Sequence, residues 1–360
     1  MCCAHQQGEP ASSKEDGGSE LTLREELRHA ILEMLQQRID PLDGFYAPDD
    51  VKESILAVLV AGRHLLLEGP PGTGKTTLAK ILASKLQPMQ AIEGCRFNCD
   101  PVAPSPLCPD CRDREDKPAV LSVPGSSRFV RIQGSPELMP EDLIGDIDPV
   151  IAMKSGIRDP RAFSPGRIQR ANRKILFIDE LNRIPERTQN TLIQVLEERT
   201  TTLAGFDFEL SVDTVVIATQ NPQEAAGVER ISDTLLDRFE RITIGYPTPE
   251  QEIAILKRYA RRQEGVEFET GLLNRIVDIS QATRDSEDIS RPASVRASLA
   301  TFEQAQAMAQ LQGRTSVGKE DIKKAALISL RSRTEVSPNS RYCADSRTLF
   351  EQIIRKGLAQ

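Results

Sequence analysis

A glycine-rich segment from Gly69 to Thr76, GPPGTGKT, fits the pattern GxxxxGK[ST] and carries groups that bind a polyphosphate. Its glycines allow the backbone to approach phosphates closely and to turn N–H groups toward them. Lys75 can reach the β- and γ-phosphates, and the Thr76 hydroxyl is suited to hold Mg²⁺. The segment therefore predicts an ATP site made of Gly69, Pro70, Pro71, Gly72, Thr73, Gly74, Lys75, Thr76 and Thr77.

Two carboxylates, Asp179 and Glu180, end the apolar segment KILFIDE (174–180), which has the composition of a buried strand. We expect Asp179 beside the Mg²⁺ and Glu180 where it polarises a water for attack on the γ-phosphate. An apolar run followed by Asp-Glu is common and is usually structural. This one lies about 100 residues after the phosphate loop and before an amphipathic helix, which favours the functional interpretation.

Asn221 follows another buried segment, TVVIATQ (214–220), rich in β-branched residues. In a parallel sheet it would lie level with the strand ends, where phosphates bind. An asparagine that precedes a proline, here Pro222, is also a common turn former. From these residues alone both interpretations of Asn221 remain open.

The elements that must position these groups alternate between strand and helix up to about residue 248. The apolar run from His64 feeds the phosphate loop as a strand, and a helix continues from the loop to Leu86. Residues 200–212 alternate around Ala-Gly and predict a β-hairpin. Further strands are expected at 128–133, 174–180, 214–220 and 241–244, and further helices at 21–37, 49–62, 186–199 and 232–239. The sequence thus predicts an α/β nucleotide-binding core over residues 21–248.

The pattern beyond Pro249 is helical throughout and contains no expected strand. The expected helices are 250–262, 271–280, 294–312 and 319–331. Residues 249–335 therefore predict a separate α-helical unit, and residues 336–360 a C-terminal tail with a candidate helix at 346–356.

Residues 88–127 interrupt the core with many prolines, four cysteines and almost no hydrophobic periodicity, which indicates a surface insertion. Two close pairs of thiols can supply a tetrahedral Zn²⁺ site. The spacing is unusual for a zinc ribbon, because three residues separate the first pair and only eight separate the pairs. A zinc site and four reduced thiols are both open for Cys95, Cys99, Cys108 and Cys111.

Composition limits the functional class. The chain has 360 residues, 39% of them hydrophobic, so it can bury a substantial core in two globular units. A net charge of −7 argues against nucleic acid as a partner. Residues 1–20 are polar and predict a disordered tail without a targeting pattern. The sequence has no apolar run long enough to span a membrane, so we expect no membrane partner. Seven cysteines, an odd count, disfavour a disulfide framework, and we expect a soluble cytoplasmic protein.

The ordered motifs GPPGTGKT, LFIDE, VIATQNP, LLDRF and RPASVRASL resemble those of AAA+ ATPases, and their surroundings resemble the branch of MoxR and magnesium chelatase subunit I. The likeness extends over 48–333. It implies a P-loop NTPase fold, an α/β core whose five parallel strands lie between helices in the order 5-1-4-3-2, followed by a smaller all-α lid. It also implies that Asn221 is sensor 1, Arg238 an arginine finger acting on a neighbouring subunit, and Arg296 the sensor 2 arginine.

The same resemblance identifies 135–165 as the helix-2 insert of this branch and 200–212 as the hairpin before sensor 1. It implies Mg²⁺-dependent ATP hydrolysis by a homo-oligomer, a hexameric ring, with a von Willebrand A-type partner protein. The insertion at 88–127 departs from typical MoxR proteins and is more like a segment of some chelatase I-type chains. The leading function is a MoxR-type motor that remodels or activates a partner. A metal chelatase subunit and a nucleotide-switched scaffold with little turnover are the alternatives.

Overall fold

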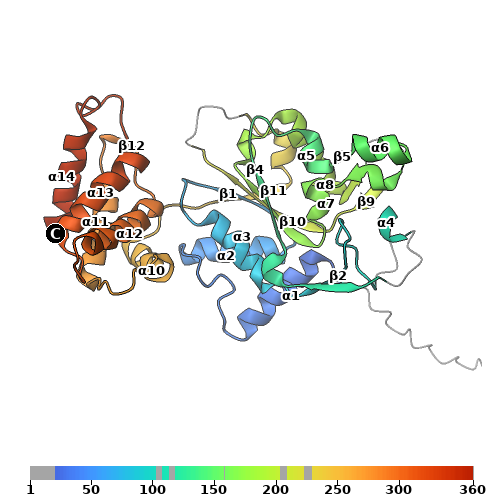
Figure 1. Ribbon diagram of the computed structural model, residues 1–360, viewed down its shortest axis with the longest axis horizontal. Coiled ribbons are helices and arrows are strands. Elements are labelled where there is room, and N and C mark those ends of the chain that lie inside the picture. The colour runs from blue at the N-terminus through green and yellow to red at the C-terminus, as the bar shows by residue number, and fades with distance from the viewer. Residues whose placement is uncertain are drawn as a thin grey trace, which may run out of the picture.

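The computed structural model describes residues 21–102, 108–112, 118–157, 159–202, 209–222 and 229–359. Figure 1 shows a sheet flanked by helices in one part of the molecule and a cluster of helices, α10 to α14, at the other end. The expected disordered tail at 1–20 lies outside the described residues. Within the described ranges no helix has the length and apolar character needed to cross a membrane.

The central sheet has five strands, and every pair of neighbours is parallel. The strands are β1 (His64–Glu68), β4 (Phe129–Gln133), β7 (Lys174–Asp179), β10 (Thr214–Gln220) and β11 (Phe239–Thr243). Their spatial order, β11-β1-β10-β7-β4, is the expected order 5-1-4-3-2, so this prediction is confirmed. The carboxyl ends share one edge, where Gln133 lies opposite Asp179 and Glu68 opposite Gln220.

Both faces of the sheet are buried, because the central strands are apolar at nearly every position. Leu65, Leu67 and Phe177 point into a core formed with α1 (Leu23–Gln36), α2 (Asp49–Val60) and α3 (Lys75–Lys85). The intervening residues, among them Leu66 and Leu176, point into a second core on the opposite face. That core includes residues of α5 (Pro140–Ile144), α7 (Arg167–Arg170), α8 (Glu186–Glu198) and α9 (Asp233–Leu236).

Three smaller structures interrupt the core. The insertion forms an antiparallel ladder of β2 (Met89–Ile92) and β3 (Val120–Val123), with the short helix α4 (Pro109–Arg112) in the chain between them. In the 135–165 segment, β5 (Asp146–Ile147) pairs with β6 (Phe163–Ser164) around α6 (Pro149–Ser155). The hairpin expected at 200–212 is confirmed by the pairing of β8 (Thr200–Thr202) with β9 (Glu209–Ser211), and its tip, 203–208, lies outside the described residues.

The second unit contains five helices within the described residues: α10 (Pro249–Tyr259), α11 (Thr270–Arg284), α12 (Val295–Leu311), α13 (Lys319–Arg333) and α14 (Ser346–Ala359). The prediction that this unit contains no strand is wrong at one place. The chain leaving α11 meets the chain leaving α13, and their backbones pair as β12 (Ile289–Arg291) and β13 (Glu335–Val336). The helix expected in a C-terminal tail is α14, whose Leu349 and Phe350 are buried in the core of this unit.

The helical unit docks on the edge of the sheet that carries the phosphate loop. Arg258 pairs with both carboxylate oxygens of Asp43, at 2.8 and 3.0 Å, and the Tyr259 hydroxyl donates to the carbonyl of Gly44 at 2.8 Å. The guanidinium of Arg284 lies 4.5 Å from the centroid of the Tyr246 ring. The start of α12 also lies against the phosphate loop, where Ser294 and Arg296 are next to Gly72.

Candidate functional site

A cavity of about 500 Å³ lies where the phosphate loop, the carboxyl edge of the sheet and the helical unit meet. Its volume is that of a typical small-molecule site. Residues from all three parts line it, including 71–77 of the loop, Arg131 and Gln133 of β4, Asp179, Glu180, Thr219, Asn221 and Arg296. The structure therefore brings Lys75, Thr76, Asp179, Glu180, Asn221 and Arg296 together around one space.

The phosphate loop has a backbone conformation that depends on glycine. Gly72 and Gly74 adopt φ values of +81° and +87°, in the left-handed region that glycine favours. A Cβ at Gly69 would lie 2.1 Å from the carbonyl oxygen of Ile244, which no side chain tolerates. Lys75 opens α3, so the loop leads directly into the positive end of an 11-residue helix. This is an anion cradle, and its donors fit a polyphosphate.

The Lys75 amine is desolvated and has neutral oxygens as its hydrogen-bond acceptors. It donates to the carbonyls of Gly69 and Pro70, both at 2.8 Å. Burial lowers the pKa of Lys75 to about 8, opposed by the charge of Asp179 and assisted by that of Arg296. A protonated amine in this setting is stabilised when charged phosphate oxygens replace neutral carbonyl oxygens as its hydrogen-bond acceptors.

This arrangement predicts proton uptake when ATP binds above pH 8. Phosphates should raise the pKa of Lys75, so near pH 9 the amine is mostly neutral in the free chain and protonated in the complex. ATP affinity should then fall as pH rises through about 8 and beyond. Calorimetric titrations at pH 9 in buffers of different ionisation enthalpy measure the uptake. Lys80→Ala, an exposed lysine on the same helix, should leave it unchanged. An enthalpy that does not depend on the buffer would contradict the prediction.

Asp179 and Glu180 are held at the edge of the sheet by neighbouring strands. Asp179 accepts a hydrogen bond from the Thr219 hydroxyl at 2.8 Å and pairs with Arg131 at 2.5 Å. Glu180 has a left-handed backbone with φ of +57°, and its N–H donates to the same hydroxyl at 2.9 Å. Its carboxylate accepts from the Gln133 amide at 3.1 Å. The two carboxylates are thus oriented by separate partners.

Arg238 lies away from this cavity. It follows α9, directly before β11, and its guanidinium pairs with Glu197 of α8 at 2.7 Å. It also donates to the carbonyl of Thr234 at 2.9 Å and lines a different hollow, together with His64 and Arg199. The chain's own site therefore does not contain the residue expected to act as arginine finger.

Several polar residues of the cavity were not singled out from the sequence, among them Arg131, Gln133 and Thr219. Their positions follow from strand pairing, since β4 and β10 both lie next to β7. A strand order combined with polar residues near the carboxyl ends would have identified them.

The four cysteines of the insertion gather at a place separate from the ATP cavity. The sulfur atoms of Cys95, Cys99, Cys108 and Cys111 all lie within 4.8 Å of one another. Among the described residues that line the ATP cavity, none is a cysteine.

A phosphate loop on a parallel sheet of this order, followed by a helical lid, defines a P-loop NTPase of the AAA+ class. Three family profiles match along the chain. "Magnesium chelatase, subunit ChlI" matches residues 48–98, "ATPase family associated with various cellular activities (AAA)" matches 119–241, and "AAA lid domain" matches 281–353.

Curated relatives agree with these profiles. The uncharacterized protein YeaC of Bacillus subtilis is 26% identical over 81% of this chain and 84% of its own length. The magnesium-chelatase 38 kDa subunit of Acidiphilium rubrum is 32% identical over 57% of this chain and 60% of that subunit. Chaperone MoxR1 of Mycobacterium tuberculosis is 27% identical over 87% of this chain and 77% of its own length. The three profiles and these relatives together support an AAA+ ATPase of the branch of MoxR and magnesium chelatase subunit I.

Proposed function

We propose that this chain is an ATP-hydrolysing ring motor of MoxR type that remodels or activates a partner protein. One observation carries the proposal. Lys75, Asp179 and Glu180 converge on one cavity, whereas Arg238 lies outside it, in the segment between α9 and β11. A nucleotide-binding switch needs Lys75 and Asp179 to bind ATP and Mg²⁺, but it needs neither a general base at Glu180 nor Arg238. A cation displaced from its own site fits a site that two subunits share.

In this proposal the loop N–H groups and Lys75 bind the phosphates of ATP. The Thr76 hydroxyl and Asp179 carboxylate are oxygen donors of the kind that Mg²⁺ prefers, and both line the cavity. When bound, Mg²⁺ neutralises charge on the phosphate oxygens. Arg131 and Thr219 hold the Asp179 carboxylate in place.

Glu180 takes the role of general base. Its carboxylate orients and polarises a water for in-line attack on the γ-phosphate, and Asn221 lies in the same cavity as a second polar group. The hydrogen bond from Gln133 keeps one Glu180 oxygen occupied, and the ion pair with Arg183 at 3.3 Å occupies the same oxygen.

Two arginines complete the proposed site. Arg296, in the first turn of α12, faces the cavity from the helical lid and links the position of the lid to the nucleotide. Arg238 would reach the ATP of the neighbouring subunit in a homo-oligomer, for which we propose a hexameric ring. It would exchange the Glu197 carboxylate for phosphate on assembly.

We further propose that the motor acts with a von Willebrand A-type partner protein.

The named relatives include a chaperone and a magnesium-chelatase subunit, so a metal chelatase ATPase subunit is the second candidate. The profile match at 48–98 supports that candidate. A scaffold that binds ATP with little turnover is the third candidate, and in such a scaffold Arg238 would have no catalytic role.

Phosphate release by the purified chain, with Mg²⁺ and with excess chelator, tests the proposal. We expect turnover that requires Mg²⁺ and rises more steeply than linearly with protein concentration. Tight ATP binding without turnover at any concentration would favour the scaffold. Nucleotide-dependent capture of a von Willebrand A-type protein would support the MoxR-type motor, and metal insertion by the captured complex would favour the chelatase.

A further inference from the structure

The four cysteines of the insertion are arranged as the ligands of one metal ion. They come from two turns: Cys95 and Cys99 follow β2, and Cys108 and Cys111 lie at α4. All four sulfur atoms are within 4.8 Å of one another, and Cys95 Sγ lies 3.8 Å from Cys108 Sγ. Two thiolates bound at about 2.3 Å to a tetrahedral ion lie about 3.8 Å apart. We propose that these residues bind one structural Zn²⁺ as a closed tetrathiolate site.

The alternative of four reduced thiols in an apolar cluster explains the arrangement less well. The cysteines share that cluster with three larger apolar side chains, Ile92, Phe97 and Phe163. Hydrophobic packing alone gives sulfur atoms no reason to face one another from two turns. A disulfide between Cys95 and Cys108 would need a separation of about 2.05 Å, much shorter than the one observed.

Backbone hydrogen bonds to sulfur support a site for thiolates. The N–H groups of Phe97 and Cys99 both donate to Cys95 Sγ at 3.4 Å, and the Cys108 N–H donates to Cys99 Sγ at 3.2 Å. Such bonds orient ligands and spread the negative charge that thiolates carry at a metal. Asn98 takes a left-handed conformation, φ +53°, which closes the first turn around Cys95.

The proposed ion would fasten the insertion to the base of the 135–165 segment. Arg96, between the first two cysteines, donates to the carbonyl of Phe163 at 2.7 Å and pairs with Asp110 at 2.9 Å. Asn98 donates to the carbonyl of Arg170, and Asn172 donates to that of Phe97, both at 3.0 Å. The first cysteine turn is therefore attached to β6 and α7, and the Arg96–Asp110 ion pair attaches the second turn to the first.

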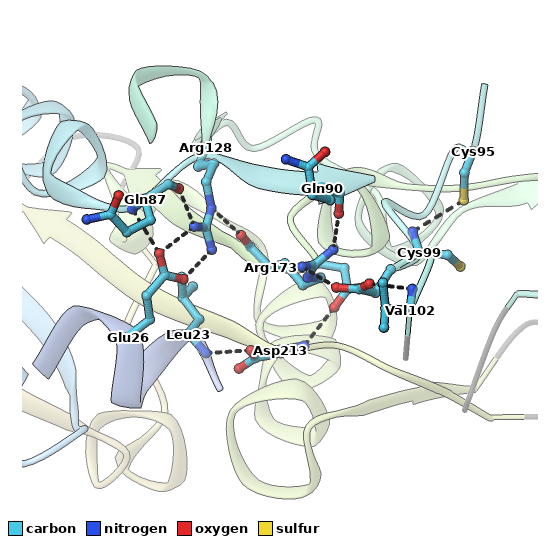
Figure 2. A network of polar contacts seen from close by, with 12 residues as sticks. Leu23, Glu26, Gln87, Gln90, Cys95, Cys99, Val102, Arg128, Arg173 and Asp213 are labelled. Atoms are coloured by element: carbon cyan, nitrogen blue, oxygen red, sulfur yellow. Dashed lines mark hydrogen bonds and ion pairs between the residues drawn. The ribbon is translucent and has the colours of Figure 1, made fainter. Parts of the chain in front are cut away.

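A second set of contacts continues from the same turns into the core. Figure 2 shows Arg173 donating to the carbonyl of Gln90, at 2.7 Å, and Arg173 also pairs with Asp100 at 2.6 Å. Farther along, Arg128 pairs with both oxygens of Glu26 and donates to the carbonyl of Gln87. Zn²⁺ would thus hold in place the outer end of a polar network that reaches α1.

Metal analysis of protein purified without chelator tests the site. We expect about one Zn²⁺ per chain, lost in Cys108→Ser and retained in the matched control Cys343→Ser, whose thiol is exposed in the lid unit. If Cys108→Ser does not fold, Co²⁺ substitution of the wild-type chain gives the same information. A tetrathiolate produces intense sulfur-to-cobalt charge transfer and visible bands of tetrahedral Co²⁺. Titration to one equivalent, reversed by Zn²⁺, supports the site.

Three results would overturn the proposal. One is metal-free protein whose melting temperature does not change with Zn²⁺ or chelator. Another is metal that persists at the same stoichiometry in folded Cys108→Ser. The third is iron with acid-labile sulfide, which would identify a cluster in place of a single ion.

Hydrogen exchange separates this structural role from nucleotide chemistry. Removing the metal should increase exchange in 88–102 and 160–172, while ATP affinity stays within about twofold, because no described cysteine lines the ATP cavity. Unchanged exchange in both segments after complete metal removal would show that the ion does not fasten them.

Discussion

Glu180→Gln should bind ATP about as tightly as the wild-type chain and hydrolyse it at least about 10²-fold more slowly. The amide has nearly the shape of the carboxylate, so the backbone bond from Glu180 N–H to Thr219 and the shape of the cavity are kept. It cannot take a proton from the attacking water. ATP should therefore remain trapped, and the effect should appear in turnover and not in binding.

Single-turnover hydrolysis and equilibrium ATP binding measure the two quantities separately. Glu186→Gln is a matched control, because Glu186 is an exposed carboxylate at the start of α8, and it should hydrolyse ATP normally. Wild-type turnover in Glu180→Gln would remove Glu180 from the role of base. A loss of ATP binding would instead assign it to nucleotide binding.

Arg238→Ala should retain ATP binding and lose hydrolysis by about 10³-fold or more, the usual contribution of an arginine finger. The residue lies outside its own cavity, so truncation leaves every described contact of the phosphate loop in place. Its exposed ion pair with Glu197 contributes little to stability, so the melting temperature should change by only a few degrees.

Concentration dependence and a second variant make this prediction specific. Arg230→Ala, which removes an exposed arginine paired with Asp233, should keep wild-type activity. Glu197→Gln releases Arg238 from its ion pair and should not lower the rate. If dilute monomeric protein hydrolyses ATP at the full rate, the site is complete in one chain and Arg238 is not a shared catalytic group.

Local spacing predicted the site where its residues lie next to one another in sequence. The loop 69–76 and the pair Asp179 and Glu180 are contiguous, and their chemistry follows from residue type. Arg131 and Gln133 could not be found in that way. Their partners Asp179 and Glu180 are 47 or 48 residues away and are reached only through pairing of β4 with β7.

For the fold too, local sequence predicted some features, and others depended on contacts between distant segments. Periodicity indicated the long elements, whereas the order of the strands came from resemblance to a family, because register depends on contacts between distant segments. The strands β12 and β13 have three and two residues, too few for a periodic signal. The place of α14 in the lid depends on which helix its apolar face meets, and Leu349 and Phe350 alone do not specify α11.

Mixing Lys75→Ala with Arg238→Ala tests the shared-site mechanism most directly. Lys75→Ala should lose tight ATP binding, because the amine that the loop directs toward phosphate is removed, but it keeps an intact Arg238. Arg238→Ala keeps an intact ATP cavity. Each variant alone should be inactive, and the mixture should recover part of the wild-type rate at interfaces that combine one good site with one good arginine. Mixtures that co-assemble, as shown by size and cross-linking, and yet remain inactive would contradict the mechanism.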